Sequence, residues 1–251
     1  MKRLTIVIFC VFLTCTLVSQ NLWAQDPIKK ADNIFEQAGY QNLQKFKEAL
    51  PLYKEALKEN PKSYEANWKT ARCCREYAKY SKQNKVEGWE DICAKFGKKG
   101  MEYAKKAIKI EPEKLEGHFY YGLSVGNYSD GVGIITAVKE GLKEKTKKHL
   151  TKAYEINKNY HDATTTLALG RYWQVLPLWY DDPDKALELY KEANRLMPED
   201  SKYRPELHVY MGKLMLDEGI NEDKARKMLK KARNSDDPYF SERAQKILAE
   251  Y

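Results

Sequence analysis

The chain has 251 residues, of which 43% are hydrophobic and 32% are charged, and its mean hydropathy is −0.73. This length fits one ordinary domain or one short helical array, and the polar composition favours an elongated array whose units expose much surface. The formal net charge is +8, but the lysines are spread along the chain and alternate with acidic residues, so we expect no nucleic-acid partner.

The first 24 residues have the pattern of an export signal. Lys2 and Arg3 precede an uncharged apolar run over residues 4–18, and Ala24 offers a small residue for cleavage. A retained membrane anchor is the alternative interpretation, although the run is too short to cross a bilayer comfortably. We therefore predict a signal peptide over residues 1–24, a single solenoid domain over residues 25–251, and an exported, periplasmic protein.

Cys15 raises the question of a lipid anchor. A lipoprotein signal needs a branched apolar residue three positions before the cysteine, whereas this chain has Phe12 there and Leu13 one position too late. Lipidation at Cys15 is therefore disfavoured.

Cleavage after Ala24 would leave three cysteines, Cys73, Cys74 and Cys93. An odd number allows at most one intrachain disulfide, which could join Cys93 to either member of the adjacent pair because both sides belong to one helical hairpin. In the other interpretation, one of the adjacent pair is a small buried residue and no bridge forms. The sequence leaves both open.

A small residue, a bulky residue four positions later and an alanine three positions further on recur five times. This spacing places the three side chains on one face of a helix, where small residues let a second helix approach closely. The five sets are Ala49/Tyr53/Ala56, Gly100/Ala104/Ala107, Thr146/Leu150/Ala153, Ala186/Tyr190/Ala193 and Ala225/Leu229/Ala232.

Proline follows the last alanine by five positions in three sets, at Pro61, Pro112 and Pro198. Proline cannot continue a helix and presets the start of the next one. The pattern resembles the tetratricopeptide repeat, which implies an all-α fold: a right-handed superhelix of about five helical hairpins. Residues 241–251 have helical apolar spacing and are predicted to form a C-terminal capping helix.

The repeats are longer than the family standard. Their last alanines lie 51, 46, 40 and 39 residues apart, against about 34 in a standard tetratricopeptide repeat. The extra residues fall between the two helices of a hairpin, chiefly over residues 81–97 and 126–141. Because these stretches contain apolar residues, we expect each to pack as an extended helix or as a lid on the groove.

We identify no catalytic, metal-binding or cofactor-binding residues. The histidines are not spaced as ligands, and no cysteine or carboxylate cluster joins them. Gly131 and Gly133 hint at a glycine loop, but a dinucleotide fingerprint would need a third glycine and a preceding strand. Gly122 and Gly126 are better explained as points where two helices pass closely. The chain is therefore predicted to be non-enzymatic.

The stretch from His118 to Tyr180 is dense in aromatic residues, which suit both a helix core and a binding groove. Arg171 lies in an apolar segment, where it either closes a structural ion pair or faces an anionic ligand. The residues that we predict to line a groove for a ligand or partner are Tyr121, Asn127, Tyr128, Arg171, Trp173 and Trp179.

The same stretch carries a second resemblance. Its strings HFYYGLSVGNYSDGVGI and LALGRYWQVLP are similar to the periplasmic T component of TRAP transporters and, more distantly, to the helical-repeat domain of eukaryotic regulators of microtubule dynamics. The resemblance implies a periplasmic repeat protein, often lipid-anchored and in some cases a trimer, that works beside a substrate-binding protein and a membrane permease.

Two functions are compatible with these patterns. In the first, the concave face holds a small apolar or carboxylated ligand, or docks a transporter substrate-binding protein as an accessory to TRAP-type solute uptake. In the second, the chain is a general protein–protein interaction scaffold of the cell envelope with no small-molecule ligand. A closed apolar channel of roughly a few hundred Å³ favours the first, and an open groove with polar ladders favours the second. Self-association is an open alternative in both.

Overall fold

The computed structural model describes residues 26–177 and 179–251. The predicted signal peptide and Cys15 lie outside the described residues, so both stay predictions. The described ranges form helices and no β-strand, which confirms the all-α fold class. Among these helices, none combines the length and the apolar character that a membrane crossing requires.

The helices pair in sequence order. Their bounds are α2 Pro27–Phe35, α3 Gln44–Glu59, α4 Tyr64–Gln83, α5 Trp89–Ile110, α6 Leu115–Val132, α7 Ile134–Lys139, α8 Leu142–Ile156, α9 Tyr160–Val175, α10 Pro183–Leu196, α11 Arg204–Asp217, α12 Glu222–Arg233 and α13 Pro238–Glu250. Five hairpins result: α2 with α3, α4 with α5, α6 with α8, α9 with α10, and α11 with α12. Helix α13 packs on α12 and α11, as the predicted capping helix should.

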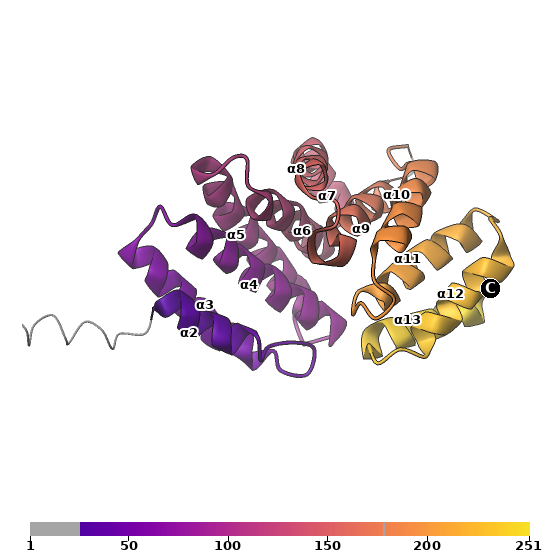
Figure 1. The fold of residues 1–251 in the computed structure, drawn as a ribbon, viewed down its shortest axis with the longest axis horizontal. Coiled ribbons are helices and arrows are strands. Elements are labelled where there is room, and N and C mark those ends of the chain that lie inside the picture. Colours follow the sequence, from indigo (N-terminus) through magenta and orange to yellow (C-terminus); the bar gives the residue numbers. More distant parts are fainter. Residues whose placement is uncertain (1–25, 178) are drawn as a thin grey trace, which may run out of the picture.

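Successive hairpins follow one another around an arc, from the indigo N-terminal helices to the yellow C-terminal helices in Figure 1. The buried residues form three clusters along this arc instead of one central core. Such a division is expected for an array in which each unit buries its apolar face against its neighbours. The predicted superhelix of five hairpins and a capping helix is confirmed.

The five recurrent sets lie on the second helices α3, α5, α8, α10 and α12, and all of their residues are buried. In three hairpins the bulky member faces a glycine of the first helix. A Cβ built on that glycine would lie 2.4 Å from Leu150 at Gly122, 2.8 Å from Tyr190 at Gly170 and 2.9 Å from Leu229 at Gly212. Glycine is therefore required there by the close packing of the two helices.

The prolines also position the helix that follows them. Each proline carbonyl accepts a hydrogen bond from the side chain six residues later, close to the start of the next first helix. The three pairs are Asn67 to Pro61 (3.2 Å), His118 to Pro112 (2.8 Å) and Arg204 to Pro198 (2.9 Å). In the repeat where Lys158 replaces proline, Thr166 Oγ1 donates to the Lys158 carbonyl at 2.8 Å.

The extra residues lengthen helices in the second hairpin and add one in the third. Helices α4 and α5 run for 20 and 22 residues, with only residues 84–88 between them. In the third hairpin α6 continues to Val132, and Gly133, with a φ of 85°, turns the chain into the short helix α7. The first insertion therefore forms the predicted extended helices, and the second supplies residues to the wall of the groove described below.

The three cysteines of the second hairpin are buried and form no disulfide. The Cys73 thiol lies 3.4 Å from the Phe46 carbonyl oxygen, and the Cys93 thiol lies 3.4 Å from that of Ala78. Burial raises the pKa of Cys74 and of Cys93 to about 12. Of the two interpretations that the sequence left open, the structure shows the unbridged one.

Candidate functional site

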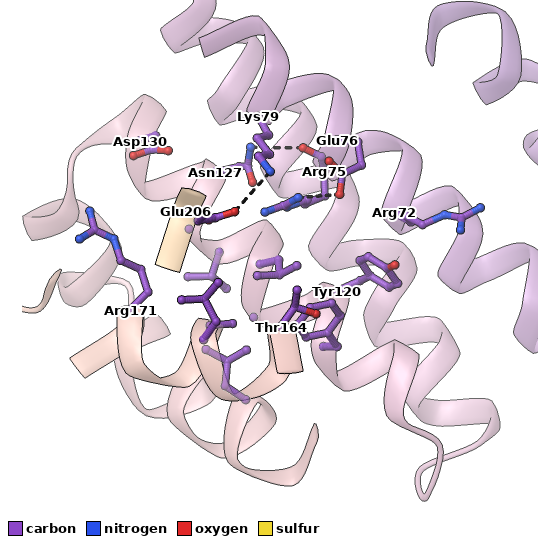
Figure 2. A pocket seen from close by; sticks show the side chains of 18 of the residues that line it. Arg72, Arg75, Glu76, Lys79, Tyr120, Asn127, Asp130, Thr164, Arg171 and Glu206 are labelled. Carbon is purple, nitrogen blue, oxygen red and sulfur yellow. Dashed lines mark hydrogen bonds and ion pairs between the residues drawn. The ribbon is translucent and has the colours of Figure 1, made fainter. Parts of the chain in front are cut away.

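The first helices of the hairpins line one continuous groove with a volume of about 1140 Å³. Its walls come from α2, α4, α6, α9, α11 and α13, with additional residues from α7 and α8. Figure 2 looks into it and shows charged side chains from α4 and α11 opposite residues of α6 and α9. About a third of the lining residues are charged, in nearly equal numbers of cations and anions.

Helix α4 lines the groove with a stripe of one tryptophan and four cations. Trp68, Arg72, Arg75, Lys79 and Lys82 follow one another at alternating steps of four and three residues, so they share one face of the helix. The opposite face packs the second hairpin through small buried residues. A long polar helix with this pattern can bury one side and still offer a charged surface.

Carboxylates from neighbouring helices compensate this stripe. Asp32 of α2 lies 2.5 Å from Lys69 Nζ and 3.4 Å from Arg72 Nη2. Further along, Asp130 of α6 lies 2.5 Å from Lys82 Nζ. These pairs span successive hairpins, so they also fix how the hairpins sit against each other.

A half-buried ion pair lies at the centre of α4. Arg75 Nη1 and Glu76 Oε1 are 2.5 Å apart, and Figure 2 marks this contact. Burial pushes the pKa of Glu76 upward, but Arg75 and Lys79 more than offset that effect, so the pKa lies below its usual range. Glu76 therefore remains a carboxylate in the groove wall at neutral pH.

Two contacts connect α4 and the turn after it to the far end of the arc. Lys79 Nζ lies 3.7 Å from Glu206 Oε2 on α11, a pair drawn in Figure 2. Lys85 Nζ, just beyond α4, lies 3.5 Å from Glu242 Oε1 on α13. The groove is consequently bridged by side chains between the second hairpin and the C-terminal helices.

The C-terminal wall is aromatic and cationic. Arg171 of α9 and Arg243 of α13 both lie over the ring of Tyr210, with their Cζ atoms 4.3 and 5.4 Å from the ring centroid. Tyr203 and Tyr239 complete this wall. Burial and the nearby Glu206 raise the pKa of Tyr210 above its usual range, so this phenol stays protonated.

The start of α9 has an unusual backbone that faces the groove. His161, Asp162 and Ala163 have φ angles of 45°, 57° and 65°, in the left-handed region that residues with a Cβ rarely adopt. Thr165 Oγ1 holds the preceding turn in place by donating to the Asn157 carbonyl at 2.8 Å. His161 and Asp162 line the groove as a result.

The groove lining also includes apolar residues from α6, α7, α8 and the end of α9. They include Gly126, Val138, Leu142, Leu150 and Leu176. No atom lies within 4 Å of a Cβ built on Gly126. The prediction of a close helix contact is therefore correct for Gly122 but wrong for Gly126, which lines the groove.

The structure does not bring the six predicted groove residues together. Asn127 and Arg171 line the groove, and the Asn127 side chain lies against the backbone of α4 at Arg75 and Lys79. The remaining four lie outside the groove lining: Tyr121, Tyr128, Trp173 and Trp179.

Those four aromatic residues have other neighbours. Tyr121 is buried against His149, with ring centroids 4.5 Å apart, and Tyr128 donates to Glu140 at 3.0 Å. Trp173 packs between two core clusters, and Trp179 is 76% exposed in the turn before α10. Tyr121 and Tyr128 are seven residues apart and so share the face of α6 that points away from the groove.

Sequence reasoning missed most of the groove lining. The missed residues include Arg72, Arg75, Lys79, Tyr203, Tyr210 and Arg243. The stripe on α4 was a usable signal, because its alternating steps of four and three mark one helix face. The pairing of Arg171 with Arg243 had no such signal, since it joins helices that are distant in the sequence.

Within the described ranges, no group of three histidine, cysteine, aspartate or glutamate side chains could hold a metal ion. An arc of helical hairpins with a charged and aromatic concave groove is the architecture of a tetratricopeptide-type repeat protein. The family described as Regulator of microtubule dynamics protein 1-3 matches residues 27–175. This is more than half of the chain, which therefore belongs to that family.

Solved structures support the fold alone. A thermophilic TPR protein from Thermus thermophilus superposes with a TM-score of 0.62 at 21% identity, covering 90% of this chain and 98% of its own. YrrB, a TPR protein with an unusual peptide-binding site, gives a TM-score of 0.49 at 16% identity, covering 93% and 97%. A search of the curated proteins found no match.

Proposed function

We propose that the chain is a non-catalytic scaffold whose concave groove binds an extended segment of a partner protein. The observation that carries this proposal is the continuous groove of about 1140 Å³, which six helices line with paired charges and aromatic rings. Aromatic side chains supply contact area at low entropic cost, and the charges supply orientation and partner choice. Repeat proteins present such concave surfaces as a consequence of their curvature.

The groove fits a peptide better than a single small molecule. Small-molecule pockets typically enclose about 300–1,000 Å³ and are mostly apolar. This groove exceeds that range, and its α4 wall is a ladder of ion pairs formed by Lys69, Arg72, Arg75, Lys79 and Lys82. An extended chain can satisfy many dispersed polar groups, whereas a compact ligand reaches few of them.

Selection from a random 12-residue peptide display library tests this proposal. Peptides that bind should slow hydrogen exchange in the first helices α4, α6, α9 and α11, because these line the groove. The second helices α5, α10 and α12, which line no part of the groove, serve as the internal control and should exchange unchanged. Failure to enrich any peptide, or protection confined to the second helices, would reject the scaffold function.

The apolar part of the groove lining supports a second candidate function, the holding of a small apolar or carboxylated ligand. Gly126, Leu142 and Leu150 belong to this part, and the cation of Arg171 on α9 lines the same groove. Native mass spectrometry of protein purified from its own cells distinguishes the two candidates. A retained small molecule of defined mass favours the ligand, and a chain free of additional mass favours the scaffold.

We further propose that binding takes place in the periplasm. The predicted export signal over residues 1–24 and the resemblance of His118–Tyr180 to the T component of TRAP transporters support this location, with a transporter substrate-binding protein as the candidate partner. Amino-terminal sequencing of the protein from its own cells should begin at Gln25. A start at Met1 in the fractionated periplasm would contradict cleavage.

A further inference from the structure

Two arginines from different hairpins meet at one tyrosine on the C-terminal side of the groove. Arg171 comes from α9 and Arg243 from the capping helix α13, and both have their Cζ atoms within 5.4 Å of the Tyr210 ring centroid. Both arginines and the tyrosine line the groove. They therefore belong to a single patch, which we call the arginine pair.

The arginine pair has only neutral partners. Arg171 Nη1 donates to Gln174 Oε1 at 2.8 Å, and Arg243 Nη1 donates to the Tyr239 hydroxyl at 3.3 Å. In the described part of the chain, neither guanidinium has a carboxylate within 4.0 Å, and Glu206 on α11 acts on Arg243 only from farther away. The arginines on the opposite wall differ, because Arg72 is paired with Asp32 and Arg75 with Glu76.

A network of neutral groups holds Arg171 in this position. Tyr190, fully buried in α10, donates to Gln174 Oε1 at 2.7 Å, and Gln174 Nε2 donates to the Tyr210 carbonyl at 3.2 Å. The guanidinium is thus oriented before any ligand arrives, which lowers the entropic cost of binding. No group in this network neutralises its charge.

A half-buried cation without a counterion is costly. Stacking on an aromatic ring recovers only part of that cost. The guanidinium group is planar and presents parallel N–H groups that match a carboxylate. An anion supplied from outside the chain is therefore the missing partner of this patch.

We propose that the arginine pair binds the carboxylate of an aspartate or glutamate side chain in the partner segment, so that the groove selects acidic peptides. This inference rests on the proposed scaffold function and names the chemistry that its groove recognises. The tyrosines beside the pair, Tyr203 and Tyr239, provide contact area for the residues next to that carboxylate.

The test uses the full mature chain and the peptides enriched from the random 12-residue library. Enriched peptides should contain Asp or Glu at a fixed position, and their Asn or Gln analogues should bind roughly 10- to 100-fold more weakly in fluorescence anisotropy. The double substitution Arg171→Gln with Arg243→Gln should cause a similar loss for the acidic peptide and none for its neutral analogue.

The matched control changes the net charge equally at exposed residues outside the groove, through Arg195→Gln with Arg233→Gln. This control should bind the peptide with an affinity within about twofold of that of the wild-type chain. Thermal unfolding of both double variants checks that they fold. Enriched peptides without a fixed acidic residue would overturn the arginine pair as an acid-binding site and leave the scaffold function standing.

Two other outcomes are also decisive. If no peptide is enriched, the scaffold function itself fails. If no peptide is enriched and vesicles containing phosphatidylserine bind the wild-type chain but not the Arg171→Gln, Arg243→Gln variant, the pair recognises a membrane surface. That result would overturn the peptide proposal.

Discussion

At the scale of single residues, the most constrained contact is a pair of histidines between α6 and α8. His118 Nε2 must donate to the Pro112 carbonyl at 2.8 Å, because that oxygen can only accept. With both rings neutral, its Nδ1 accepts from His149 Nδ1 in the 2.8 Å contact. Protonating both rings would place two N–H groups face to face, which adds to burial in lowering the pKa of His149.

Acidification should destabilise the fold through these buried histidines. Burial lowers the pKa of His149 to about 4, with His118 and Lys148 lowering it further, and burial with Arg204 lowers the pKa of His208 to about 4. The unfolded chain binds more protons than the folded chain between about pH 6.5 and pH 4. The contribution of these histidines to the free energy of unfolding is therefore fully present above pH 6.5. It is lost as the pH falls from 6.5 toward 4.

Urea unfolding at pH 7.5 and at pH 5.0 measures this effect, in a range where most carboxylates remain ionised. We expect the free energy of unfolding to be about 2–4 kcal/mol lower at pH 5.0, where the lower figure allows for the partial exposure of His149. The control variant His149→Phe with His208→Leu removes the two groups and should lose more than half of that difference. An unfolding free energy that is the same at both pH values would contradict the assignment of neutral buried histidines.

At the scale of helices, glycines set how closely α5 and α6 approach. A Cβ on Gly97 of α5 would lie 2.4 Å from the Tyr128 backbone nitrogen, and one on Gly131 of α6 would lie 2.4 Å from the Ala94 backbone nitrogen. Each helix thus places a glycine against the backbone of the other. Because backbone atoms cannot move aside as a flexible side chain can, these contacts leave no room for a methyl group.

Gly131→Ala should therefore destabilise the protein by about 1–3 kcal/mol through overpacking. Gly126→Ala is the matched control, because it lies in the same helix with no atom within 4 Å of the added carbon. It should stabilise the protein by about 0.4–1 kcal/mol, since alanine restricts the unfolded chain. Thermal unfolding of both variants decides the matter, and equal shifts in Tm would be inconsistent with the described packing of α5 on α6.

The sequence predicts the helices and their pairing into hairpins well. Each recurrent set of three residues specifies a buried helix face, and the prolines at Pro61, Pro112 and Pro198 mark where one hairpin ends and the next begins. The direction in which a first helix faces is harder to predict. Helix α6 is apolar on most sides, so periodicity alone did not show that Tyr120 faces the groove while Tyr121 faces the core.

At the scale of the whole molecule, ion pairs across the arc join the second hairpin to the C-terminal helices. Lys79 on α4 and Glu206 on α11 come from hairpins two and five, and both side chains are 17% exposed. Nothing in the sequence pattern relates these two residues, because curvature accumulates over the whole array. For the same reason, the arginine pair could not be predicted, whereas Arg171 could be singled out as a cation within an apolar segment.

Reversing one charge of this bridge should open the arc. Glu206→Lys places a cation beside Lys79 and Arg75, and the repulsion should separate the C-terminal helices from α4. Small-angle X-ray scattering should then show a larger radius of gyration, with the helix content unchanged by circular dichroism. Glu222→Lys, at the exposed start of α12, is the control for charge alone, and an unchanged radius in both variants would show that the bridge does not hold the arc closed.

The central claim is that partners bind inside the arc, and photo-crosslinking tests it most directly. A benzoylphenylalanine placed at Tyr203 reports on the groove. One placed at Tyr103, a half-buried residue of the second helix α5 outside the groove lining, is the control. With a library-selected peptide as the probe, the account predicts crosslinking from position 203 and none from position 103. Crosslinking from position 103 alone would contradict it.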